Sequence, residues 1–387
     1  MRFLRGIDWL GLAAMTVLIA IGTVAIWSAG SAREEAVFHG LWMRNLTTAL
    51  LGFALYLALA RCDYRKWLGL AAPAFYAVSA ALLVAVLLVG SEQFGGKRWL
   101  WFFQPSEIAK IAVIVLLAAL FGDGAVARSR SGFRGFALAA VLIAVPTLLI
   151  LAEPDLGTAL TLVPATAVML FAAGVWRRGF LTLAAVGGLA TLALFGAVYE
   201  AERPGTSPER RERIMRHVPL RDHQVRRIRT FLFPEGDARG AGYNLRQAMI
   251  SIGSGGFSGK GVGKGETNHL KYLPPAVSMN DFIFCVYAEE TGFIGSVALL
   301  GLFGLLLVSC CRVAAASEDG VGRLLALGTA TLLFAHVYVN IAMSIGVLPI
   351  TGLPLPFISS GRTFLIVTMC ALGLVQSVAI HGKEKLC

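Results

Sequence analysis

Residues 282–311, FIFCVYAEETGFIGSVALLGLFGLLLVSCC, decide the fold, because a run this long and this apolar fits the hydrocarbon core of a bilayer. A membrane-spanning helix needs about 20 mostly apolar residues. Nine further runs of near spanning length occur at 8–30, 43–60, 68–90, 106–122, 135–152, 158–175, 180–199, 324–346 and 363–380. The sequence therefore predicts an all-α polytopic membrane protein with about ten transmembrane helices.

The composition supports the same class. Hydrophobic residues make up 57% of the chain and charged residues only 15%, whereas a soluble domain carries about 25% charged residues. The first apolar run is too long for the core of a cleavable signal peptide, so we expect the N-terminus to stay in the mature chain. The cysteines show no metal-ligand spacing, so we expect them to pack without a disulfide or zinc; they stand at positions 62, 285, 310, 311, 370 and 387.

Lysine and arginine are distributed unevenly between the predicted loops. With a cytoplasmic N-terminus, the inside segments carry 14 Lys and Arg residues and the short outside loops carry four. The positive-inside rule then predicts that both termini are cytoplasmic. We interpret residues 1–387 as a single membrane domain, with one long extracytoplasmic loop at 200–280 between helices 7 and 8. The net charge of +11 then favours an anionic lipid or lipid-linked substrate as partner, with no role for nucleic acid.

The long loop is basic, with 14 Lys and Arg residues against 8 Asp and Glu residues. Its segment 207–234, SPERRERIMRHVPLRDHQVRRIRTFLFP, places apolar residues at roughly helical spacing with arginines on the other faces. Such a helix can lie on the membrane surface beside anionic head groups. It can equally be a solvated charged helix held by Glu–Arg pairs, and the pattern alone does not separate these two interpretations.

A glycine-rich segment follows at 242–265, GYNLRQAMISIGSGGFSGKGVGKG. Its basic residues Arg246, Lys260 and Lys264 are candidate ligands for a phosphate, because glycine-rich backbone can approach phosphate oxygens closely. The P-loop pattern does not fit, since each lysine is followed by glycine rather than Ser or Thr. The alternative is structural, with the glycines permitting tight turns and close helix packing.

Ionisable residues near the ends of membrane spans are candidates for function. In QPSEIAKIA, Glu107 and Lys110 stand three residues apart, so they share a helix face and can neutralise one another. Such a pair either contributes to a site or only fixes helix packing. Asp155, in the turn AEPDLGTAL, is a candidate for substrate binding or a simple cap of the following helix.

Asp281 stands immediately before the long apolar run. It could cap that helix together with Asn280. However, a carboxylate half-shielded by lipid and protein has a raised pKa, which suits a general base that removes a proton from a hydroxyl group. Glu289 and Glu290 lie about 12 Å deeper along the same helix and need partners inside the bundle.

Several segments together resemble the SEDS family, and its rod-shape branch more than its division branch. They are FLFPEGDARGAGYNLRQAMISIGSGGFSGKGVGKG, DFIFCVYAEETGFIG and LPITGLPLPFISSG, with QPSEIAK and EPDLGTAL. The resemblance covers nearly the whole chain in the family's order, which makes it more specific than any single motif.

The resemblance implies a peptidoglycan glycosyltransferase of the bacterial cytoplasmic (inner) membrane that serves cell elongation and shape. It would polymerise lipid II into a growing glycan strand on the outer face, together with a class B penicillin-binding transpeptidase and membrane proteins of the elongation complex. By motif, Asp281 is the catalytic base, and Glu107 and Lys110 line the same cavity. Undecaprenyl pyrophosphate would be the leaving group, held by cations, and whether a divalent cation assists stays open because no ligand set stands out.

The chain also departs from the family pattern on both sides of the expected site. Before the apolar run, LPPAVSMNDF has Pro275 and Asn280 where the family has Glu and Thr, and it lacks the usual His. In SSGRTF, Ser360 and Arg362 replace Tyr and Gly. We expect Arg362 to compensate near the pyrophosphate.

Two other classes of function remain as alternatives. A bundle with ionisable residues in its spans also suits a flippase or transporter of lipid-linked precursors, and a non-catalytic scaffold could recruit a transpeptidase. The outward gathering of charges and the lack of paired broken helices favour the enzyme.

Overall fold

The computed structural model describes residues 6–31, 36–93, 96–101, 103–122, 132–203, 205–218, 220, 222–236, 240–270 and 272–382. Its long helices are α2 (Trp9–Ser31), α4 (Leu41–Arg61), α5 (Tyr64–Val89), α6 (Pro105–Phe121), α8 (Phe133–Ala152), α9 (Leu156–Ala172), α10 (Arg177–Glu202), α16 (Ile283–Ala316), α17 (Gly320–Ser344) and α18 (Arg362–His381). Each of the ten apolar runs in the sequence corresponds to one of them.

Eight of these helices are long and apolar enough to cross a membrane. The other two, α6 and α9, have 17 residues each, which is the lower limit of about 17 residues for a span. The prediction of an all-helical membrane bundle with about ten spans is therefore confirmed.

The shorter elements lie mostly in the long loop. They are α3 (Ala36–His39), α11 (Pro208–Met215), α12 (Asp222–Leu232), η1 (Pro234–Gly236), α13 (Ala241–Ser254), α14 (Glu266–His269) and α15 (Pro275–Ser278). The sequence did not predict the antiparallel hairpin of β1 (Ser91–Gln93) and β2 (Gly96–Trp99) between α5 and α6.

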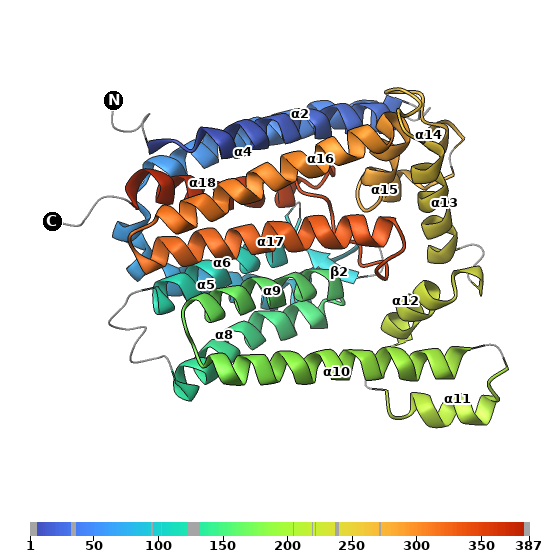
Figure 1. The fold of residues 1–387 in the computed structure, drawn as a ribbon, viewed down its shortest axis with the longest axis horizontal. Helices are drawn as coiled ribbons and strands as arrows, with labels where there is room; N and C mark the ends of the chain where they lie inside the picture. Colours follow the sequence, from blue (N-terminus) through green and yellow to red (C-terminus); the bar gives the residue numbers. More distant parts are fainter. Residues whose placement is uncertain are drawn as a thin grey trace.

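The bundle has two distinct ends. Figure 1 shows the start of α2 and the end of α18 at one end, and α12 to α15 at the opposite end. Ten spans return the chain to the side from which it started, and the seven spans before the long loop leave that loop at the opposite end. The elaborated loop and the region just before α16 therefore lie on the same side of the bundle.

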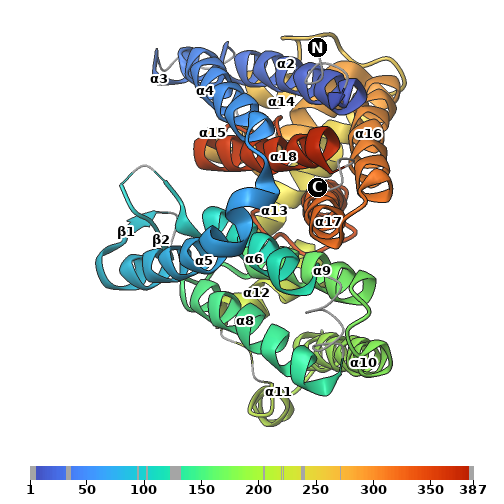
Figure 2. The ribbon, with the colours of Figure 1, turned by 90° about the vertical axis from the view of Figure 1, so that its left-hand side faces the viewer.

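The centre of the bundle is formed by α6, α17 and α18. In the most apolar windows of α17 and α18, 67% and 72% of the residues are buried inside the protein, compared with 6% for α10. Figure 2 shows α10 at the edge of the helix assembly, beyond α8 and α9. Most of the surface of α10 is therefore left for lipid to cover.

The arginine-rich segment forms two helices, α11 and α12, instead of one. Its Val218 and Val225 pack against Val198 of α10. Arginines of the segment pair with glutamates at Arg210–Glu200, Arg211–Glu202, Arg229–Glu202 and Arg216–Glu212. This arrangement supports the interpretation of a charged segment held by Glu–Arg pairs.

Candidate functional site

Asp281 lies in the short connection between α15 and α16, at the end of the bundle that carries the long loop. The residue at the N-cap of α16 is Phe282, and no side chain caps this helix. Asp281 is half-buried, and no described residue donates a hydrogen bond to its carboxylate. The structure therefore does not support the interpretation of Asp281 as the cap of α16.

The backbone of Asp281 is fixed by α17 and by the α17–α18 connection. The Asn340 side chain is fully buried, and its Nδ2 donates to the carbonyl of Asp281 at 2.9 Å and to that of Leu353 at 2.6 Å. Gly352 has φ +76°, and a Cβ at that position would stand 3.5 Å from Oδ2 of Asp281. The glycine of LPITGLPLPFISSG thus lets the backbone turn beside the carboxylate, in a conformation that other residues rarely adopt.

Two arginines from distant segments face this carboxylate. Arg227 of α12 donates through Nη1 to the carbonyl of Thr351 at 3.3 Å, beside Gly352. Arg98 of β2 donates to two carbonyls of the α8–α9 turn, from Nε to Glu153 at 3.3 Å and from Nη2 to Pro154 at 2.5 Å. Both guanidinium groups act electrostatically on Asp281.

The protonation of the site follows from burial more than from charge. Burial raises the pKa of Asp281 to about 6, with the nearby Asp155 adding to the rise and Arg227 and Arg98 opposing it. Burial likewise raises the pKa of Glu153 to about 8, again with Asp155 adding and Arg98 opposing. Near neutral pH, Glu153 is therefore largely protonated, whereas Asp281 is largely ionised and close to its pKa.

Asp155 is buried and caps α9, as its position in the turn suggested. Its Oδ1 accepts from the amide of Thr158 at 3.1 Å and its Oδ2 from the Thr158 hydroxyl at 2.9 Å. Oδ2 also accepts from Nε2 of Gln104, the residue before α6, at 3.0 Å. Asp155 therefore ties α6 to α9 and places a negative charge near Asp281.

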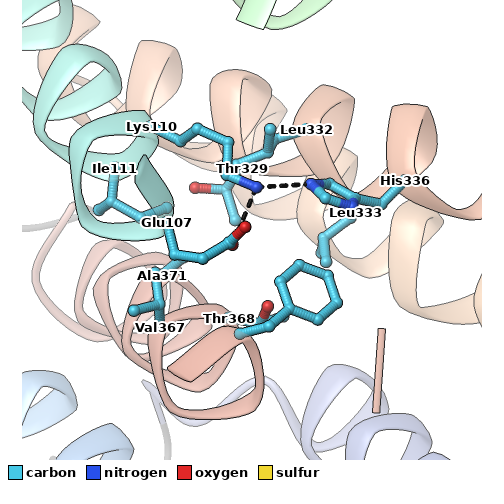
Figure 3. Close-up of a pocket in the computed structure, with 11 residues that line it drawn as sticks. Glu107, Lys110, Ile111, Thr329, Leu332, Leu333, His336, Val367, Thr368 and Ala371 are labelled. Carbon is cyan, nitrogen blue, oxygen red and sulfur yellow. Dashed lines mark hydrogen bonds and ion pairs between the residues drawn. The ribbon is translucent and has the colours of Figure 1, made fainter. Parts of the chain in front are cut away.

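Glu107 and Lys110 form the expected pair inside the bundle, with Lys110 Nζ 2.9 Å from Glu107 Oε2 and both side chains buried. Figure 3 shows Lys110 lying between Glu107 and His336 of α17, whose Nε2 is 2.8 Å from Nζ. They line a cavity of about 10 Å³, roughly the space for one water molecule. Asp281 is not among the residues that line this cavity. Phe364 lies over both His336 and Lys110, with ring centroids 4.6 Å apart and Nζ 5.4 Å from its centroid.

The glycine-rich segment packs against a kink in α16. Gly292 has φ +66° inside this helix, so the amide of Phe293 donates to the carbonyl of Gly256 at 2.9 Å instead of continuing the helix ladder. Lys260 Nζ lies 2.8 Å from Oε1 of Glu289, and the same oxygen accepts from the amide of Glu266 at 2.9 Å.

Glu290 accepts a hydrogen bond from the hydroxyl of Ser28 in α2. Glu289 and Glu290 therefore both have polar partners inside the bundle, as their position along α16 predicted. In this arrangement the Lys260 ammonium is paired with two carboxylates, those of Glu289 and Glu266.

The remaining predicted ligands lie in three separate segments of the chain. Arg246 is half-buried on α13, whereas Lys264 is exposed in the glycine-rich segment. Arg362 is exposed at the first position of α18 and lies close enough to Arg44 of α4 for the two charges to interact. No described acid forms an ion pair with Arg246, Lys264 or Arg362.

Two departures from the family pattern contact each other. The Ser360 hydroxyl donates to Oδ1 of Asn280 at 2.5 Å, and the Ser359 hydroxyl donates to the carbonyl of Asn280 at 2.7 Å. Asn280 and Ser360, which both depart from the family pattern, are thus partners in one hydrogen bond directly before Asp281.

The sequence reasoning missed Arg98, Arg227, His336 and Asn340. In the sequence, Arg98 and Arg227 are two of many basic residues in loops, with no motif around them. His336 and Asn340 stand four residues apart in an apolar run, which places them on one helix face, and this spacing could have marked them. Among the described residues, no group of three or more His, Cys, Asp or Glu side chains is arranged to hold a metal ion.

Comparison with known proteins covers nearly the whole chain. Residues 8–384 match the sequence profile of FtsW, RodA and SpoVE, described as cell cycle protein. The peptidoglycan glycosyltransferase MrdB of Escherichia coli is 34% identical over 377 residues, 96% of this chain and 93% of MrdB. A probable peptidoglycan glycosyltransferase FtsW of a Geobacter species is 35% identical over 393 residues, 99% of each chain.

Solved structures agree with these sequence matches. A chain from a peptidoglycan synthase complex, described as coordinating polymerization and crosslinking, has a TM-score of 0.74 and 31% identity, covering 98% of this chain and 99% of that one. The crystal structure of the rod shape determining protein RodA of Thermus thermophilus has a TM-score of 0.68 and 30% identity, covering 98% of both chains.

Proposed function

Because the chain belongs to the SEDS family, the family of FtsW, RodA and SpoVE, we propose that it is a peptidoglycan glycosyltransferase of the rod-shape branch. It polymerises lipid II into glycan strands on the outer face of the bacterial cytoplasmic membrane, in cell elongation and shape maintenance. Both termini are cytoplasmic in this proposal, which places Asp281 and the long loop outside.

The observation that carries the proposal is the setting of Asp281. Its carboxylate receives no hydrogen bond from a described residue, burial raises its pKa to about 6, and two guanidinium groups act on it from separate elements. A base with a pKa of about 6 is about 90% ionised at pH 7 and holds a proton more firmly than an ordinary aspartate. This combination suits general-base catalysis near neutral pH.

In the proposed step, Asp281 takes the proton from the 4-hydroxyl of the acceptor sugar. The oxygen attacks the anomeric carbon of the donor, and the bond from that carbon to the pyrophosphate oxygen breaks. The electron pair leaves with undecaprenyl pyrophosphate, and Asp281 later gives its proton to water. Arg98 and Arg227 are placed to stabilise the negative charge that develops on the leaving group.

We assign the remaining predicted residues by their surroundings. Arg246, Lys264 and Arg362 are further cations for the substrate's phosphates. Asp155 orders the site through the α8–α9 turn, and Lys260 holds the glycine-rich segment on α16 through Glu289.

The buried Glu107–Lys110 pair is assigned a positioning role. The pair lies in the centre of the bundle, bound to His336, and Asn340 stands one helical turn further along α17 and holds the backbone of Asp281. The pair therefore fixes the part of the bundle on which the base is mounted.

A transpeptidase partner is part of the proposal. One similar chain comes from a peptidoglycan synthase complex that coordinates polymerization and crosslinking. We propose that this chain likewise works with a class B penicillin-binding transpeptidase and with other membrane proteins of the elongation complex.

The test is polymer formation from purified lipid II by the purified protein, with and without a divalent cation. Wild type is expected to form glycan polymer, and Asp281→Asn is expected to form none while remaining folded. Glu212→Gln, which removes an exposed carboxylate of α11, is the matched control and should retain activity. Polymer formation by Asp281→Asn at the wild-type rate would contradict the assignment of the base, and a transporter or scaffold would tolerate that substitution.

A further inference from the structure

A second basic site lies beside the proposed catalytic site, on the other side of α12. A cavity of about 540 Å³ opens between α12 and the start of α13, within the range of about 300–1,000 Å³ that is usual for ligand sites. Arg226 and Arg229 line it together with Phe233 and the backbone of Gly236 and Gly240. None of these residues takes part in the contacts of Asp281.

The charge in this cavity is only partly neutralised. Nε of Arg229 lies 3.3 Å from Oε2 of Glu202, and Glu202 also pairs with Arg211 at 2.7 Å. Two arginines therefore share one carboxylate. Arg226 is exposed and forms no ion pair with any described acid, so its guanidinium donors are free of described acids. Counted over the described residues alone, the lining carries more positive than negative charge.

The helix geometry places this cavity and the catalytic site back to back. At about 100° per residue, Arg226 and Arg229 point within about 60° of each other, whereas Arg227 points about 100–160° away from them. Arg227 faces the backbone beside Asp281, where it donates to the carbonyl of Thr351. The cavity and the backbone beside the base therefore lie against different faces of α12.

We infer that this cavity binds the carboxylates of the stem peptide carried by the donor sugar, with Arg226 and Arg229 as the ligands. This inference rests on the proposed function. The sugar that contains the reacting anomeric carbon also carries the peptide, so the peptide begins next to Asp281. Five extended residues span at most about 17 Å, which is comparable to half the circumference of a helix about 10–12 Å across.

The chemistry of the cavity fits a peptide carboxylate. Arginine binds carboxylates through paired hydrogen bonds. Phe233 supplies an apolar wall for small side chains. The inference therefore makes the peptide a determinant of substrate affinity, separate from the pyrophosphate that Arg98 and Arg227 hold.

The test compares lipid II carrying its pentapeptide with lipid II from which the peptide has been removed. For Arg226→Ala, we expect the KM for the pentapeptide substrate to rise about tenfold, with kcat nearly unchanged, because the variant loses a charge-assisted hydrogen bond to the carboxylate. The KM for the stripped substrate should not change. Arg226→Lys should recover part of the affinity, and Arg216→Ala, on exposed α11, should behave as wild type with both substrates.

A binding measurement separates this inference from the proposed function. Soluble N-acetylmuramyl pentapeptide should bind the wild-type protein in calorimetry and bind Arg226→Ala about tenfold more weakly, even if no polymer forms from lipid II. Equal binding by the two proteins would overturn the inference. So would an equal rise in KM for stripped and complete lipid II, since that would place the phosphates or the lipid in the cavity.

Discussion

Replacing Asp281 with asparagine should make the protein more stable and inactive. The substitution keeps the shape of the side chain and removes its charge. Burial holds the pKa of Asp281 at about 6, compared with 3.8 for an ordinary aspartate. At about 1.4 kcal/mol per pH unit, this difference corresponds to about 3 kcal/mol.

The direction of this effect depends on pH. Because the folded-state pKa is the higher one, the folded protein keeps a proton that the unfolded chain loses as the pH rises from about 4 to about 6. Protonation therefore stabilises the fold fully below pH 4, and this stabilisation is lost as the pH rises through 6. At pH 7, Asp281→Asn is expected to be up to about 3 kcal/mol more stable than wild type.

Thermal unfolding of both proteins in detergent between pH 4 and pH 8 measures this difference. With an unfolding entropy of about 2.1 cal/mol/K per residue over 387 residues, the rise in Tm at pH 7 is about 4 °C, and it should vanish near pH 4. Polymerisation should fall by at least about 10²-fold, the usual share of a general base. A variant that is less stable than wild type at pH 7, or a Tm difference that does not change with pH, would refute the reasoning.

Three further predictions concern the surroundings of the base. The rate of polymerisation should fall below about pH 6, and Arg227→Gln should move this limb to higher pH because Arg227 lowers the pKa of Asp281; a pH–rate profile with an unmoved limb would count against the arginine's role. Lys260→Met should cost about 1–3 kcal/mol of unfolding free energy, since Glu289 keeps its amide donors but loses its cation, whereas exposed Lys264→Met should leave the Tm unchanged. Arg362→Gly should raise the KM for lipid II several-fold if Arg362 binds phosphate, and unchanged kinetics would dispose of that role.

The membrane spans could be predicted closely from the sequence because their length is set by the bilayer. The run at 8–30 became Trp9–Ser31, and the run at 282–311 became Ile283–Ala316. The hydropathy along the chain therefore indicates the position and length of each span, since the residues of a span lie in an apolar environment. The hairpin at 91–99 was missed because its short strands carry no comparable apolar signal.

The candidate site was only partly predictable. Asp281 could be singled out because placing a carboxylate beside a membrane-spanning run costs free energy whatever the tertiary structure is. The roles of Arg98 and Arg227 depend on the distant backbone carbonyls that they bind. The sequence does not distinguish these two arginines from the other basic residues in loops. Lys260 shows the converse, because the carboxylate that engages it, on Glu289, stands 29 residues further along the chain and becomes its partner only through tertiary packing.

The exposed flank of α10 links the site to the thickness of the membrane. This helix has 26 residues, a length of about 39 Å, which exceeds the roughly 30 Å of hydrocarbon it must cross. Its packing against α12, the helix that carries Arg227, is more extensive than its packing against α9, so a change in the tilt of α10 is transmitted to α12. We expect a thinner bilayer to tilt α10 further, to move Arg227 relative to Asp281, and to make the rate of glycan synthesis depend on acyl-chain length.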